Sequence, residues 1–377
     1  MRELRLRAYE DVTADTLQRL SNNSPGGILC PRLERLHWDA CGTDNALLFV
    51  RLFLSPSLKK VTLYNYLLLT QSDLSIAIAR VISLLPISLQ DVSIEPGYEG
   101  DEALVDAVSS FICRCGPSLR SFSTRTPLSE VAIRYVIQLP NLRSWTVTRG
   151  PPRTVPASIL PSLEQLHLDR TEALPWLHLL ASRQKGIVHE HSASAMSHAR
   201  TRESLKSITC PGSAIVDSTL LSSLITFRNL ATLRVQPDCP GEEVCMFRLT
   251  DDDMENLATA LPRLEILELG SPCDYDSCNN TVASLLSISV HCLDLTVLET
   301  HFNARTIVGD MQRLFDGGIG SDRAKCKLSR LMVSLPFEVR GKDIRAVMVR
   351  LKVIFPCLEA VGYDGYWRQL SSELGDR

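Results

Sequence analysis

A short apolar phrase recurs along the chain and constrains its fold more than any other feature. The phrase is Leu, two variable residues, an apolar residue, one variable residue and usually another apolar residue, as in LEQLHL from Leu163 to Leu168. Successive first leucines are about 30 residues apart, which suits one strand plus one helix per unit. The sequence therefore predicts a repeat array. The twelve copies begin at Leu33, Leu58, Leu89, Leu119, Leu142, Leu163, Leu205, Leu230, Leu264, Leu295, Leu328 and Leu358.

Segments with helical periodicity separate the phrases. Thr250 precedes three aspartates, which favour a helix start, and an apolar stripe then ends before Pro262. The stripe consists of Met254, Leu257, Ala258 and Leu261. Ser72 is expected to cap an earlier helix, and residues 101–115, 129–139 and 341–355 follow the same pattern. Each unit is therefore predicted to be strand, turn and helix.

Alternation within the phrase indicates how each strand lies. The fourth and sixth residues are expected to point into the core, and the third, fifth and seventh to point out. A unit of this kind cannot bury its apolar face alone, so neighbouring units must stack. The predicted fold is α/β, a leucine-rich-repeat solenoid (a horseshoe) with a parallel inner sheet, outer helices and about twelve irregular repeats. It is expected to extend over residues 1–377 as one array. An ordinary α/β domain would not explain so regular a spacing.

Charge and composition exclude several classes of partner. The net charge is −3, with 40 basic and 43 acidic side chains mixed along the chain, so neither nucleic acid nor a membrane surface is expected as a partner. The N-terminus carries Arg2, Glu3 and Arg5 where a signal peptide would need an apolar run. Twelve cysteines scattered through a long chain indicate reduced thiols, and hence a cytoplasmic or nuclear protein.

The phrases resemble the irregular repeats of F-box and leucine-rich-repeat proteins, especially the long fungal sets, which have a ribonuclease-inhibitor-like solenoid. The resemblance covers almost the whole chain. It implies that the repeats bind a substrate protein, while an F-box near the N-terminus docks a Skp-type adaptor of a cullin ubiquitin ligase. No F-box pattern is visible before Leu33. A Skp-type adaptor is therefore expected as a partner only if an F-box lies upstream.

The two ends and one interval depart from the repeat. Leu4 and Leu6 look like the tail of a thirteenth phrase, so we expect the chain to begin inside an array and to self-associate through that end. Residues 183–204, within the longest interval, are rich in Ser, Ala and charge and are expected to form an inserted loop. Residues 363–377 carry an aromatic cluster and a polar tail and are expected to form a C-terminal cap.

Several residue groups suggest enzyme or metal chemistry but lack the required spacing. His189, Glu190 and His191 with His198 fall in the expected loop. The cysteine pairs Cys113/Cys115 and Cys273/Cys278 do not have the two-residue spacing of a zinc or redox pair. Gly317–Gly320 lacks the Lys that follows a phosphate loop. No catalytic residue, metal site or cofactor is therefore predicted.

The outward-pointing strand residues are the candidate binding site. They lie on the predicted concave face, the surface that curved solenoids usually use, and they run from basic to acidic along the chain. The candidates are Arg35, His37, Lys60, Tyr64, Asp91, Glu95, His167, Asp169, Glu268, Glu299 and His301.

The sequence thus predicts a non-enzymatic protein-recognition scaffold with a protein partner of unknown identity. By its resemblance it is the substrate-binding repeat domain of an F-box-like ubiquitin-ligase adaptor. The alternative is a repeat regulator or activator of a small GTPase or another signalling protein. An F-box upstream would favour the first role, and accelerated GTP hydrolysis would favour the second.

Overall fold

The chain divides into two compact units in the computed structural model. The first unit is Met1–Thr171 with Arg183–Thr201, and the second is Glu172–Ser182 with Arg202–Arg377. The structure describes residues 2–7, 14–23, 27–39, 46–65, 71–96, 100–152, 159–169, 173–181, 201–212, 215–236, 246–270, 279–300, 326–333, 349, 351–363 and 366–369.

All twelve phrases form strands. In the first unit the strands run parallel and pair in chain order. They are β1 (Glu3–Arg7), β2 (Arg35–Asp39), β3 (Lys60–Asn65), β4 (Asp91–Pro96), β5 (Ser121–Thr124), β6 (Ser144–Val147) and β7 (Gln165–Leu168). The leading strand β1 contains Leu4 and Leu6, so the fragment of a thirteenth phrase is also a strand.

The second unit repeats this arrangement. Its first six strands are parallel and pair in chain order, and the last strand turns back to pair antiparallel with its predecessor. They are β8 (Ser207–Pro211), β9 (Thr232–Gln236), β10 (Ile266–Leu269), β11 (Val297–Thr300), β12 (Arg330–Val333), β13 (Ala360–Tyr363) and β14 (Tyr366–Gln369).

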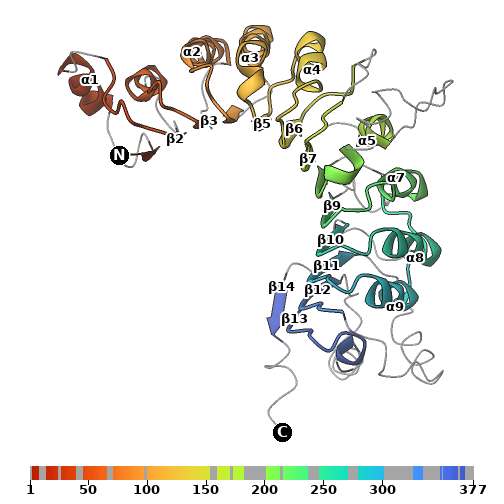
Figure 1. Cartoon of the computed structure of the whole chain (residues 1–377). Coiled ribbons are helices and arrows are strands. Elements are labelled where there is room, and N and C mark those ends of the chain that lie inside the picture. The colour runs from red at the N-terminus through yellow and green to blue at the C-terminus, as the bar shows by residue number, and fades with distance from the viewer. Residues whose placement is uncertain are drawn as a thin grey trace, which may run out of the picture. The chain divides into compact units, whose positions relative to one another are not determined.

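Helices connect the strands and lie on one side of the sheet within each unit (Figure 1). In the first unit they are α1 (Ala14–Asn23), η1 (Ala46–Phe53), α2 (Gln71–Leu84), α3 (Glu102–Cys115), η2 (Gly116–Ser118) and α4 (Glu130–Val136). In the second they are α5 (Ala173–Ala181), α7 (Ser218–Leu224), α8 (Asp251–Ala260) and α9 (Val282–His291). None of the described helices is long and apolar enough to cross a membrane.

The repeated leucines form the core. Each of the twelve first leucines of the phrases, from Leu33 to Leu358, has an exposed fraction of 0%. The fourth-place residues are also buried and pair across neighbouring strands, as Leu36 does with Val61 and Leu267 with Leu298. Burying one such side chain is worth about 1.5 to 3 kcal/mol. The chain is therefore an α/β leucine-rich-repeat solenoid, as predicted.

Among the described helices with a predicted start, the starts agree with the structure to within two residues. The start of the helix expected over residues 341–355 lies outside the described residues. Thr250 caps α8 through a capping box with Asp253, and the predicted apolar stripe of this helix is buried. The helix expected to follow Ser72 already begins at Gln71 as α2, two residues earlier than predicted. Apolar periodicity identifies the buried face of a helix but leaves its first residue open by one or two positions.

The irregular segments are described only in part. Of the expected loop over residues 183–204, the structure describes Thr201–Ser204, which are helical. The buried Thr201 hydroxyl donates to the backbone oxygen of Ile159 at 2.6 Å. Residues 370–377 lie outside the described residues, and at the expected cap the backbone of Gly362 pairs with Trp367 in the β13–β14 ladder. The single array over 1–377, the loop and the cap stay predictions.

Candidate protein-binding surface

The third, fifth and seventh residues of each phrase form what we call the open face, the side of each unit's sheet away from its buried core. On β4 the burial alternates along the strand, with Val92 and Ile94 buried and Asp91, Ser93 and Glu95 partly exposed. Strand register aligns equivalent side chains in rows across the sheet. In the first unit one row of third-place residues is Glu3, Arg35, Lys60, Asp91, Ser121, Ser144 and Gln165.

One group of open-face residues encloses a concavity of about 580 Å³, the N-terminal hollow. Glu3 lies 3.0 Å from Arg5 and 3.4 Å from Arg35, and these two guanidinium groups lower the pKa of Glu3. The His37 and Tyr64 rings lie 5.2 Å apart at a tilt of 50°. The residues that line the hollow are Glu3, Arg5, Arg35, Leu36, His37, Lys60, Thr62, Tyr64 and Asp91.

A second group, the Arg125 cluster, lies on the same face of the first unit. The Arg125 Nε is 3.4 Å from Glu95 Oε2 and 3.9 Å from Asp169 Oδ2, so one cation contacts two carboxylates. The Ser123 hydroxyl donates to Glu95 Oε1 at 2.8 Å. Burial lowers the pKa of His167, against the opposing effect of Asp169 and Glu95. This cluster joins side chains from β4, β7 and the turn after β5.

The second unit carries a comparable group, the Arg234 cluster, on β9, β10 and β11. Arg234, Glu268 and Glu299 hold fifth places and are adjacent in register. The Arg234 Nε lies 3.1 Å from Glu268 Oε2, as an ion pair without the alignment of a hydrogen bond. Burial raises the pKa of Glu299, Glu268 raises it further, and Arg234 opposes the shift. Two carboxylates are therefore direct neighbours here.

The structure brings most of the predicted site residues together. Arg35, His37, Lys60, Tyr64 and Asp91 share the N-terminal hollow. The acids Glu95 and Asp169 meet at Arg125, and His167 belongs to the same cluster. Glu268 and Glu299 are adjacent, while His301 lies outside the described residues.

Two arginines at the centre of these groups were absent from the predicted site. Arg125 holds the seventh place of the phrase from Leu119, and Arg234 holds the fifth place of the phrase from Leu230. The strand alternation that selected Glu95 and Glu268 as outward-pointing residues also predicts both arginines on the open face. Each arginine compensates the charge of a predicted acid on another strand. The sequence of a single strand does not show such a pairing.

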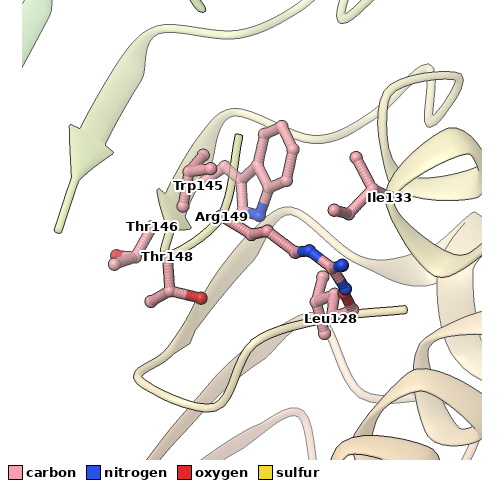
Figure 2. Close-up of a pocket in the computed structure, with 7 residues that line it drawn as sticks. Leu128, Ile133, Trp145, Thr146, Thr148 and Arg149 are labelled. Carbon is pink, nitrogen blue, oxygen red and sulfur yellow. The ribbon is translucent and has the colours of Figure 1, made fainter. Parts of the chain in front are cut away.

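A small cavity beside β6 has no room for a ligand. Figure 2 shows the Arg149 side chain extended toward Leu128, whose backbone oxygen accepts a hydrogen bond from Arg149 Nη1 at 3.3 Å. Trp145, Ile133 and Thr148 also line this space, which measures about 10 Å³. That volume holds about one water molecule.

The described residues contain no cluster of three or more His, Cys, Asp or Glu that could hold a metal ion. Cys113 is exposed and Cys115 is buried, and burial raises the pKa of Cys115 to about 12, so these two do not form a reactive thiol pair. His189, Glu190, His191 and His198 lie outside the described residues, as do Cys273, Cys278 and Gly317–Gly320.

Comparison with known proteins adds no argument about the fold or the function. No protein-family model and no curated protein matches the chain. Among solved structures, a chain of the Rad7 and Elc1 complex in yeast is similar, at 16% identity and a TM-score of 0.37. The match covers 96% of this chain and 75% of that chain. The class of protein is thus defined by its own repeats, as a leucine-rich-repeat solenoid.

Proposed function

We propose that the chain is a non-enzymatic protein-recognition scaffold that binds a partner protein on its open face. The observation that supports this is the assembly of charged and aromatic side chains from separate repeats into shared groups. Arg and Tyr are enriched at protein interfaces, and stacked repeats present extended surfaces to their partners. The N-terminal hollow and the Arg125 cluster lie on one such surface in the first unit.

The finer role that we propose is substrate recognition in a ubiquitin-ligase adaptor of the F-box type. This proposal rests on the resemblance of the repeat phrases, and a Skp-type adaptor enters it only together with an F-box.

We place the protein in the cytoplasm or nucleus, because the seven described cysteines that carry free thiols suit a reducing compartment. Nucleic acid is not expected as a partner, since the net charge is −3.

Site-specific photo-crosslinking tests the proposed surface. A benzoylphenylalanine at Gln165, an exposed open-face position, should capture a partner from extracts of the native cells. The control position is Val131 on α4, which is 71% exposed on the helical side. The captured protein is then purified, and its binding to the chain and to Arg125→Glu is measured by calorimetry.

The proposal predicts crosslinking from Gln165 only, and at least tenfold weaker binding of the purified partner to Arg125→Glu. Crosslinking from Val131 alone would show that the helical side binds partners. Accelerated GTP hydrolysis by a captured GTPase would support the alternative role of GTPase activator and contradict the ubiquitin-ligase role.

A further inference from the structure

We propose that the N-terminal hollow binds an acidic, extended segment of the partner protein, with one partner carboxylate seated between Arg35 and Lys60. This inference rests on the proposed function and specifies the chemistry of the partner at one part of the open face. It follows from the charge order, the available donors and a hydroxyl at the floor of the hollow.

The charge order across the hollow places two cations side by side. Glu3, Arg35, Lys60 and Asp91 are successive neighbours in strand register, so the row reads negative, positive, positive, negative. Like charges directly opposite on neighbouring strands destabilise a sheet. Neighbouring strands lie about 4.8 Å apart, a separation that one carboxylate can bridge. An anion between Arg35 and Lys60 would turn this repulsion into two attractions.

The cations retain donors for such an anion. Among the described residues, Arg5 and Arg35 each use one nitrogen on Glu3, through Arg5 Nε and Arg35 Nη1. A guanidinium group has five N–H donors, so four remain on each. Lys60 forms no ion pair with any described residue. Glu3 thus positions two arginines and leaves most of their N–H donors available to a bound anion.

The floor of the hollow carries Thr62. Its residue is only 8% exposed, and its hydroxyl forms no hydrogen bond within the part of the chain that the structure describes. The Thr62 hydroxyl oxygen is still reached by solvent, so it is available to a bound anion. A carboxylate oxygen in the hollow would accept a hydrogen bond from Thr62.

The electrostatic field at His37 is consistent with an anion site. Burial is the first cause of the lowered pKa of His37, and the positive charges of Arg5, Arg7 and Lys60 lower it further. Asp39 opposes them without reversing the shift. The tilted His37–Tyr64 pair lies beside these cations and offers ring surface to the apolar part of a bound segment.

The same observations favour a peptide over a nucleic acid. The three cations Arg5, Arg35 and Lys60 share the hollow with the carboxylates of Glu3 and Asp91. A continuous phosphate backbone would lie against those carboxylates and be repelled. A segment with single, spaced carboxylates can place one on the cations and keep its other residues clear of Glu3 and Asp91. A hollow of about 580 Å³ accommodates a few side chains.

Fluorescence anisotropy with the full chain and a labelled twelve-residue peptide of alternating Glu and Gly tests the inference. The Arg35→Gln/Lys60→Gln double variant should bind this peptide at least tenfold more weakly. Thr62→Val should bind it about threefold more weakly. The matched control is Lys59→Gln, which removes a neighbouring lysine that pairs with Glu34 outside the hollow, and it should change binding less than twofold.

Controls separate this inference from the proposed function. Circular dichroism and the unfolding midpoint confirm that each variant is folded. Equal binding of the same peptide with Gln in place of Glu would overturn the inference. So would an equal effect of Lys59→Gln and the double variant, or tighter binding of a uridine dodecanucleotide. If any of these occurs while Gln165 still crosslinks a partner, the scaffold function stands and the acidic-segment inference fails.

Discussion

The Arg125 and Arg234 clusters contain the same charges in different orders. Each has one arginine and two carboxylates on an open face. In the first unit, Arg125 contacts both Glu95 and Asp169, and both carboxylate side chains are 17% exposed. In the second unit, Arg234 contacts Glu268, and Glu299 lies on the far side of Glu268. The cation thus contacts both acids in one cluster and only one acid in the other.

This difference shows that the position of the cation matters as much as the number of charges. A carboxylate beside a guanidinium group keeps its charge at low cost, whereas one beside another carboxylate is pushed toward protonation. The raised pKa of Glu299 follows that rule, with burial as its first cause. The first cluster is therefore expected to stabilise its unit, and the second to carry residual repulsion.

The largest effect is expected in the apolar core that each unit contains. Leu163 in the first unit and Leu264 in the second are both 0% exposed. Leu163→Ala and Leu264→Ala should each lower the free energy of unfolding by about 2 to 5 kcal/mol, because each leaves a cavity. Urea unfolding measures the loss, and hydrogen exchange shows whether neighbouring repeats are weakened as well. A loss below about 0.5 kcal/mol, typical of surface changes, would contradict the burial of these leucines in the core.

The sequence predicted the core far better than the charge clusters. Leu163 and Leu264 could be predicted because the repeat places an apolar residue at a fixed position, and stacking requires it to be buried. Glu95 and His167 were placed on the open face by the same alternation. That Arg125 would contact Glu95 and Asp169 depends on side-chain reach across several strands, which no local pattern encodes. Residues 301–325 lie outside the described residues.

An intermediate effect is expected when the shared cation of the first cluster is removed. Arg125→Met leaves Glu95 and Asp169 without their ion pairs, and it should cost about 1 to 2 kcal/mol of unfolding free energy. The matched control is Arg134→Met on α4. Arg134 is 44% exposed against 45% for Arg125, but it pairs with an equally exposed Glu130, so its loss should cost about 0.3 to 0.5 kcal/mol.

Urea unfolding at pH 7 and low salt measures both losses. High salt should shrink the control effect more than the Arg125 effect, because exposed pairs are screened more strongly. Equal losses for the two variants would mean that the Arg125 cluster is an ordinary surface ion pair. The two clusters would then differ only in the repulsion between Glu299 and Glu268.

The smallest expected effect, with the opposite sign, concerns Glu299. Glu299→Gln removes one of two neighbouring carboxylates and should raise the unfolding free energy at pH 7 by about 0.5 kcal/mol. Glu268→Gln, the matched control, removes the partner of Arg234 as well as the repulsion, so it should give no gain.

The pH dependence separates relief of repulsion from a simple packing effect. The folded protein holds the pKa of Glu299 above its ordinary value, so the protonated side chain is favoured by folding. Its contribution to stability is complete below the unfolded pKa near 4.5 and is lost as the pH rises through the raised folded pKa. The advantage of Glu299→Gln should therefore be absent at pH 4 and grow toward pH 7. Urea unfolding from pH 4 to pH 7 measures it, and a constant difference would show that charge is not its cause.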